Sequence, residues 1–176
     1  MDISLLSKID SETAGDLLSQ GLPLVNLFIQ GDFKIIRDTA YQKEIVINNC
    51  IVENFDGSST QFEIPIKLTN THFIDCHFEF SYFSKGLLIE NCVFEKYLDF
   101  QAGGHNQIGY PIAISNNTFL DFVNFFDCWY NGEVFVTNNN FSKGTNIESK
   151  NQYITFGKVP SIINNTGQTN IESEFA

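Results

Sequence analysis

The chain has 176 residues, of which 43% are hydrophobic, so it is long enough to form one domain with a continuous core. It carries 21 acidic and 10 basic residues, and its formal net charge of −11 at pH 7 opposes binding to nucleic-acid phosphates and anionic lipid headgroups. We therefore expect no nucleic-acid partner and no membrane partner. Arg37 is the only arginine, which excludes clustered guanidinium groups for phosphate binding.

Residues 1–23 are expected to form a helical N-terminal cap. The apolar contacts of a helix over residues 2–20 would come from Leu5, Leu6, Ile9, Leu17 and Leu18. Gly21 suits the end of this helix, and Pro23 follows it. The segment lacks the basic region and long apolar run of a secretory signal, so a cytoplasmic location is expected.

A motif of alternating apolar residues followed by asparagine occurs six times after this segment. The asparagines are separated by 21, 21, 25, 22 and 26 positions, and they are Asn49, Asn70, Asn91, Asn116, Asn138 and Asn164. A period in the low twenties with strand-like alternation predicts one solenoid turn per repeat. We expect the asparagines to form a structural ladder in which side-chain amides bond from coil to coil.

A finer step of about five residues lies within the repeats, with a large residue in the middle of each side and a small one two positions earlier. In one coil the large residues are Phe73, Phe78, Phe83, Leu88 and then Phe94. A later coil continues through Phe119, Phe125, Tyr130, Phe135 and Phe141, with Glu133 out of place among the small residues. We interpret the large residues as the filling of a narrow tube.

This pairing of a small residue with a central Phe or Leu resembles the pentapeptide-repeat family over about residues 24–171. The resemblance implies a right-handed, four-sided β-helix. The extra residue in most turns is similar to pectate lyase-like β-helices, so three-sided and four-sided coils both stay open. We predict an all-β fold: a right-handed parallel β-helix of about six to seven coils over residues 24–176, with the short α-helical cap before it.

Candidate binding residues lie one position before the interior residues, where side chains should point outward, and in a longer turn over residues 102–110. Loops on a rigid scaffold often carry binding residues, and exposed aromatic side chains dominate binding hot spots. The candidate binding surface consists of Trp129, Tyr82, His77, Asp99, His105 and Tyr110.

No catalytic motif appears at a spacing that its chemistry requires. We therefore expect no catalytic residues, no metal site and no cofactor. The four cysteines lack metal-binding spacing and are expected to be reduced, buried thiols: Cys50, Cys76, Cys92 and Cys128.

The leading hypothesis is a non-catalytic protein-binding or scaffolding module with an unidentified protein partner, in which two copies can join through the C-terminal coil. The resemblance also implies an alternative, an acidic DNA-mimic inhibitor of a DNA-binding enzyme such as a topoisomerase. A third hypothesis is a carbohydrate-binding or carbohydrate-cleaving β-helix.

Overall fold

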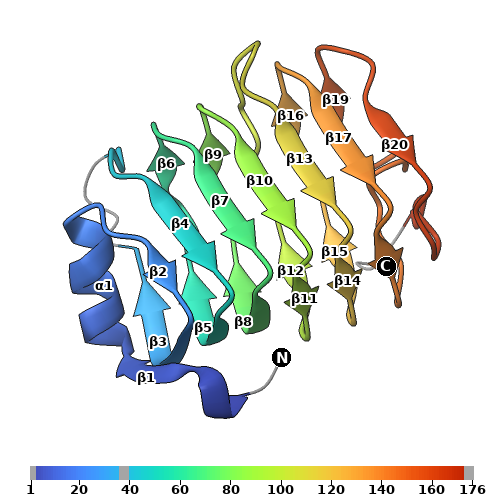
Figure 1. The fold of residues 1–176 in the computed structure, drawn as a ribbon. Helices are drawn as coiled ribbons and strands as arrows, with labels where there is room; N and C mark the ends of the chain where they lie inside the picture. The colour runs from blue at the N-terminus through green and yellow to red at the C-terminus, as the bar shows by residue number, and fades with distance from the viewer. Residues whose placement is uncertain (1–2, 36–39, 173–176) are drawn as a thin grey trace.

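The chain winds into a right-handed parallel β-solenoid of about seven turns, which confirms the predicted fold class (Figure 1). The computed structural model describes residues 3–35 and 40–172, so Arg37 lies outside the described residues. Each strand pairs in parallel with the equivalent strand of the next coil. Backbone hydrogen bonds therefore run along the axis of the solenoid, and each coil covers the core of its neighbour.

Four stacks of strands enclose the core. Faces 1 and 2 share a nine-stranded sheet: β1 (Ser7–Asp10), β3 (Leu27–Lys34), β5 (Ile51–Asp56), β8 (His72–His77), β11 (Val93–Phe94), β12 (Leu98–Asp99), β14 (Thr118–Phe119), β15 (Val123–Asn124) and β18 (Asn140–Phe141). Face 3 contains β6 (Gln61–Phe62), β9 (Tyr82–Phe83), β16 (Trp129–Tyr130) and β19 (Thr155–Phe156). Face 4 contains β2 (Leu24–Val25), β4 (Ile45–Asn48), β7 (Ile66–Thr69), β10 (Leu87–Glu90), β13 (Ile112–Ser115), β17 (Val134–Thr137) and β20 (Ser161–Ile163). β12 and β15 belong to face 2, and β11, β14 and β18 to face 1.

Stacked phenylalanines fill the interior, as the step of about five residues predicts. On face 1, Phe73, Phe94, Phe119 and Phe141 form one column with ring centroids 4.9–5.2 Å apart and nearly parallel planes. On face 2, the Phe78, Phe100 and Phe125 rings are stacked at 5.6 and 5.1 Å. Offset stacking adds to the burial of each ring, so these columns are a main source of stability.

Face 4 departs from the predicted register. Leu88 is only half-buried and Phe135 is 42% exposed, whereas their neighbours Leu87, Ile89, Val134 and Val136 are buried. The prediction that Leu88 and Phe135 fill the interior is therefore wrong. The step from Phe83 to Ile89 is six residues instead of five, and this extra residue moves the alternating strand by one position, which reverses the face of every side chain. Glu133 points outward and pairs with Lys158.

The predicted asparagine column is present at the corner between faces 4 and 1. All six residues have positive φ angles of 51–58°, and Asn26 extends the column with φ 59°. Asparagine tolerates this left-handed conformation better than most residues. The backbone N–H of Asn70 donates to Glu90 O at 3.0 Å, and Asn91 and Asn116 repeat the pattern on the following coils.

The continuous side-chain ladder lies one residue further along the chain. Asn117 Nδ2 donates to Asn139 Oδ1 at 3.0 Å, and Asn139 Nδ2 donates to Asn165 Oδ1 at 3.0 Å. In earlier coils this inward position is held by Cys50, Thr71 and Cys92. The predicted ladder is thus confirmed in part: Asn49 Nδ2 donates to Asn26 Oδ1 at 2.6 Å and Asn70 Nδ2 donates to Asn48 Oδ1 at 2.9 Å. In the later coils the coil-to-coil side-chain bonds belong instead to the residue after the predicted asparagine.

The N-terminal cap is only partly helical. The segment starts with the 3₁₀ turn η1 (Ile3–Leu5), β1 pairs with β3, and the α-helix α1 covers only Ser11–Ser19. The predicted helix over residues 2–20 is therefore too long. Asp10 ends the strand and caps the helix, because its carboxylate accepts a 2.8 Å hydrogen bond from Thr13 N. Gly21, with φ 75°, follows the end of α1 as predicted.

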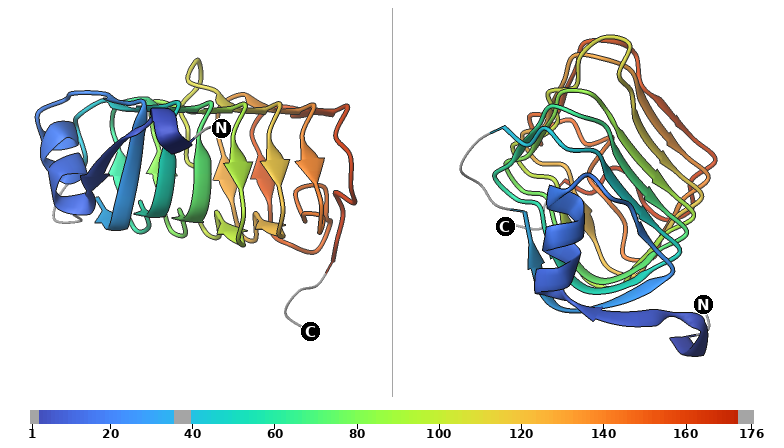
Figure 2. Two further views of the ribbon diagram at one scale, coloured as in Figure 1. Left: turned by 60° about the horizontal axis from the view of Figure 1, so that its bottom comes forward. Right: turned by 60° about the vertical axis from the view of Figure 1, so that its left-hand side comes forward.

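The two ends of the solenoid differ. At the N-terminal end, Ala14 and Leu18 of α1 are buried against the first coil, and α1 lies across this end of the row of coils (Figure 2). At the other end, β19 and β20 each have a strand neighbour on one side only within the described residues, whereas β18 is also bridged by Thr166. The apolar residues Phe156 and Ile162 of the last coil are only half-buried.

Candidate functional site

Two exposed rings and a half-buried one lie in a row on the outside of face 3. Tyr82, Gly104 and Trp129 are aligned on consecutive coils, and the His105 ring lies between the two larger aromatic rings. The His105 centroid is 4.1 Å from that of Tyr82 and 6.1 Å from that of Trp129, with planes tilted by 41° in each case. Tyr82 is 40% exposed and Trp129 is 55% exposed. We call Tyr82, His105 and Trp129 the aromatic strip.

The outward position of His105 depends on an unusual backbone. His105 occupies the register position of Phe83 and Tyr130, which are both buried, yet its ring contacts Tyr82 on the outside. Gly104 and His105 have φ angles of 99° and 55°. A Cβ atom at position 104 would lie 2.7 Å from Trp129 O and 2.9 Å from the Tyr130 ring, so only glycine fits here.

The predicted turn over residues 102–110 contains Gly104 and His105, and a buried asparagine holds the remainder of the turn at its base. Asn106 is 0% exposed, and its Nδ2 donates to Tyr110 O at 2.9 Å and to Glu133 O at 3.1 Å. Tyr110 lies in this loop, where its ring is 4.3 Å from Lys85 Nζ. Sequence reasoning missed Asn106, because nothing in a glycine-rich segment distinguishes a buried asparagine from an exposed one.

His77 and Asp99 lie on face 2 and do not join the aromatic strip. His77 Nε2 is 3.1 Å from Asp75 Oδ1, and Nδ1 is 3.9 Å from Glu79 Oε2. The Asp99 carboxylate accepts hydrogen bonds from Gln101 N at 2.8 Å and Asn124 Nδ2 at 2.9 Å. Burial raises the Asp99 pKa above its ordinary value. This carboxylate is therefore engaged in holding successive coils together.

Two further aromatic residues flank the strip at the corner between faces 2 and 3. Phe80 and Tyr153 are both exposed, and both have positive φ angles, 60° and 55°. Tyr153 packs edge-on against Phe126, with centroids 5.8 Å apart. The sequence gives no signal for these positions, because their exposure follows from a left-handed backbone that aromatic residues rarely adopt.

Charge on face 3 is sparse and of one sign. The segments 59–63, 80–84, 102–106, 127–131 and 153–157 contain two carboxylates, Glu63 and Asp127, and no lysine or arginine. Partial burial lowers the pKa of His105 below its ordinary value, so its imidazole is neutral at pH 7. The aromatic strip is therefore an apolar surface with a slightly negative border.

The cysteines are poor nucleophiles. Cys50, Cys76, Cys92 and Cys128 are all free and buried, as predicted. Burial raises the pKa of both Cys92 and Cys128 to about 12, so their thiols stay protonated at neutral pH. Within the described ranges, no group of three or more His, Cys, Asp or Glu side chains is placed to hold a metal ion.

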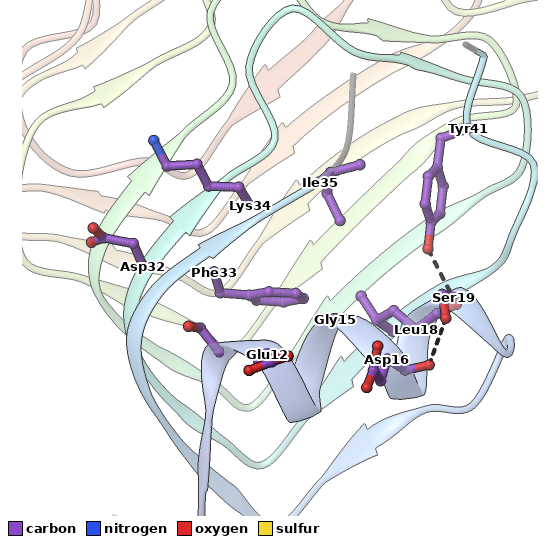
Figure 3. A pocket seen from close by; sticks show the side chains of 11 residues that line it. Glu12, Gly15, Asp16, Leu18, Ser19, Asp32, Phe33, Lys34, Ile35 and Tyr41 are labelled. Carbon is purple, nitrogen blue, oxygen red and sulfur yellow. Dashed lines mark hydrogen bonds between the residues drawn. The ribbon is translucent and has the colours of Figure 1, made fainter. Parts of the chain in front are cut away.

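A cavity of about 540 Å³ lies between α1 and the first coil (Figure 3). Phe33, Leu18 and Ile35 supply its apolar wall, and Glu12 and Asp16 lie along the helix side. Tyr41 Oη donates to Leu18 O at 3.2 Å across this space. The cavity is thus the junction of the cap with the first coil, on a different part of the molecule from the aromatic strip.

Comparison of the chain with protein-family models, curated proteins and solved structures gave no significant match. In the part of the chain that the structure describes, no helix combines the length and apolar character required to cross a bilayer.

Proposed function

We propose that the protein is a non-catalytic protein-binding module of the pentapeptide-repeat type, and that it recognises its partner through the aromatic strip. The observation that carries this proposal is the exposure of Trp129 and Tyr82 on either side of His105 on one solenoid face. Tryptophan and tyrosine are enriched among the residues that dominate binding energy. A stacked backbone holds them in place before binding, which reduces the entropy lost on association.

The surroundings of the strip favour an extended contact. Phe80 and Tyr153 are exposed at one corner of face 3, and Ile108 and Tyr110 of the loop are also exposed. Scattered exposed apolar residues are ordinary on protein surfaces, whereas a contiguous group of them indicates an interaction site. Four free thiols agree with the cytoplasmic location that we propose.

The test is a capture experiment with three matched proteins. Immobilised wild-type protein should retain a protein partner that the Trp129→Ala variant loses. The Phe135→Ala variant, which removes a 42% exposed aromatic ring from face 4, should retain it. Binding should then be repeated with the purified partner. Retention of carbohydrate alone, or equal binding by all three proteins, would contradict the proposal.

We also propose that two copies associate through the C-terminal coil. Within the described residues, β19 and β20 have no strand on one side, and Val159 and Ile163 of the last coil are exposed. Unpaired strand edges favour association with another chain. Such pairing would place two aromatic strips in one assembly, which suits a scaffold.

A further inference from the structure

Asp127 occupies a special position beside the aromatic strip. The register of Trp129 with Gly104 and Thr155 places Asp127 in the corner column between Ala102 and Tyr153. Asp127 is exposed, and within the described chain its carboxylate makes no ion pair and accepts no side-chain hydrogen bond. Its charge is therefore available to a partner.

The lysines nearest to Asp127 in the sequence, Lys143 and Lys150, make no ion pair with it among the described residues: Lys143 Nζ is 2.8 Å from Asp121 Oδ2, and Lys150 is exposed. The lysines at the opposite corner are also engaged. Lys85 Nζ donates to Gln107 Oε1 at 2.8 Å and lies over the Tyr110 ring, and Lys158 pairs with Glu133. These groups belong to the corner between faces 3 and 4, on the opposite side of the strip from Asp127. No side chain of face 3 itself supplies a positive charge to the carboxylate.

Trp129 offers the best ring in the chain for a positive charge. An indole attracts a lysine or arginine side chain more strongly than phenol or benzene does. The His105 ring meets the indole at 41° and 6.1 Å, so it does not lie flat on it. Because His105 is neutral at pH 7, it does not repel a cation there.

We propose that face 3 docks a segment of a partner protein that presents a lysine or arginine, with the cation held between the Trp129 indole and the Asp127 carboxylate. This inference rests on the proposed function and adds the chemistry of the partner. The net charge of −11 also favours a positively charged partner, because it accelerates encounter with a basic surface.

The probe is the blocked peptide (Lys-Gly)₄, compared with (Gln-Gly)₄ of equal length. Trp129 is the only tryptophan in the chain, so its fluorescence reports on this face directly. The lysine peptide should shift the emission saturably and bind at least about ten-fold more tightly than the glutamine peptide. Raising the salt concentration from about 50 to about 500 mM should weaken binding several-fold.

Two substitutions that remove one negative charge each separate the site from general attraction. Asp127→Asn should weaken binding of the lysine peptide several-fold. Glu90→Gln, on the outer surface of face 4, should leave binding unchanged. By calorimetry, Trp129→Leu should abolish binding, whereas Trp129→Phe should retain part of it because a ring remains.

The outcomes distinguish this inference from the proposed function. Equal binding of both peptides, no binding of either, or equal losses in Asp127→Asn and Glu90→Gln would overturn the cationic partner. The proposed function would then still be judged by the capture experiment. A shift of Trp129 emission by cellohexaose but by neither peptide would overturn both, because the strip would then be a carbohydrate platform.

Discussion

The N-terminal and C-terminal ends of the solenoid differ in how the core of the terminal coil is covered. At the N-terminal end, β1 continues the sheet beyond β3, and α1 packs Ala14 and Leu18 onto the first coil. At the C-terminal end, no such segment covers the last coil within the described residues, and Phe156 and Ile162 are only half-buried. A repeat stabilises itself only where it has two neighbours, so a non-repeating segment or another molecule must complete each end.

The largest expected effect comes from comparing the middle of the core with the open end. Phe94→Ala removes a buried ring stacked on both sides and should lower the free energy of unfolding by about 3–5 kcal/mol. Phe156→Ala removes a half-buried ring and should cost less than about 2 kcal/mol. Urea denaturation measures both. Equal losses would show that the last coil is covered as well as the middle ones.

The next prediction concerns the N-terminal end, where α1 covers the first coil. Leu18→Ala removes a buried contact between α1 and the first coil, and it should cost about 2–4 kcal/mol. The matched control is Leu22→Ala, just beyond the helix, where the side chain is exposed and the change should stay within about 0.5 kcal/mol. If both variants unfold at the wild-type urea concentration, α1 does not seal the first coil.

The third prediction concerns association rather than folding. Val159 is 97% exposed and Ile163 in β20 is 54% exposed, so replacing both with Glu should shift sedimentation from dimer towards monomer with little change in stability. Leu120→Glu, at an exposed position in the middle of the solenoid, should leave the dimer intact. A wild-type protein that sediments as a monomer at all concentrations would contradict association through this end.

The smallest expected effects on stability come from substitutions at two glycines of the N-terminal cap. Gly21 has a φ of 75° after the end of α1, so Gly21→Ala should cost about 1 kcal/mol. Gly15 lies inside the helix, where an added Cβ would be in ordinary contact with Phe33 at 4.0 Å. Gly15→Ala should therefore stabilise the protein by about 0.5–1 kcal/mol. The midpoint temperature of thermal denaturation should fall for Gly21→Ala and rise for Gly15→Ala. A shift in the same direction for both variants would contradict this helix boundary.

The architecture was predictable from the sequence because each coil repeats one physical requirement. A left-handed corner favours asparagine, and the spacing of Asn49, Asn70 and Asn91 therefore marks the coils. The large residue that fills each side predicts the phenylalanine columns. The inward-pointing residues of face 4 were predicted wrongly because Leu87, Leu88 and Ile89 are all apolar, so composition alone cannot decide which of them points inward.

The candidate site was only partly predictable. Tyr82 and Trp129 follow from the alternation of each strand, but their contact through His105 depends on positive φ angles at Gly104 and His105. Phe80 and Tyr153 were missed for the same reason. Such backbone conformations are set by the packing of neighbouring coils, and a single sequence does not reveal them.

The most direct test of recognition through the aromatic strip is radical footprinting of the protein with its captured and purified partner. Oxidation of Trp129 and Tyr82 should fall on binding, while Phe135 on face 4 remains unchanged. Protection confined to Val159 and Ile163, with Trp129 still fully reactive, would place the partner at the C-terminal end and contradict recognition through the aromatic strip.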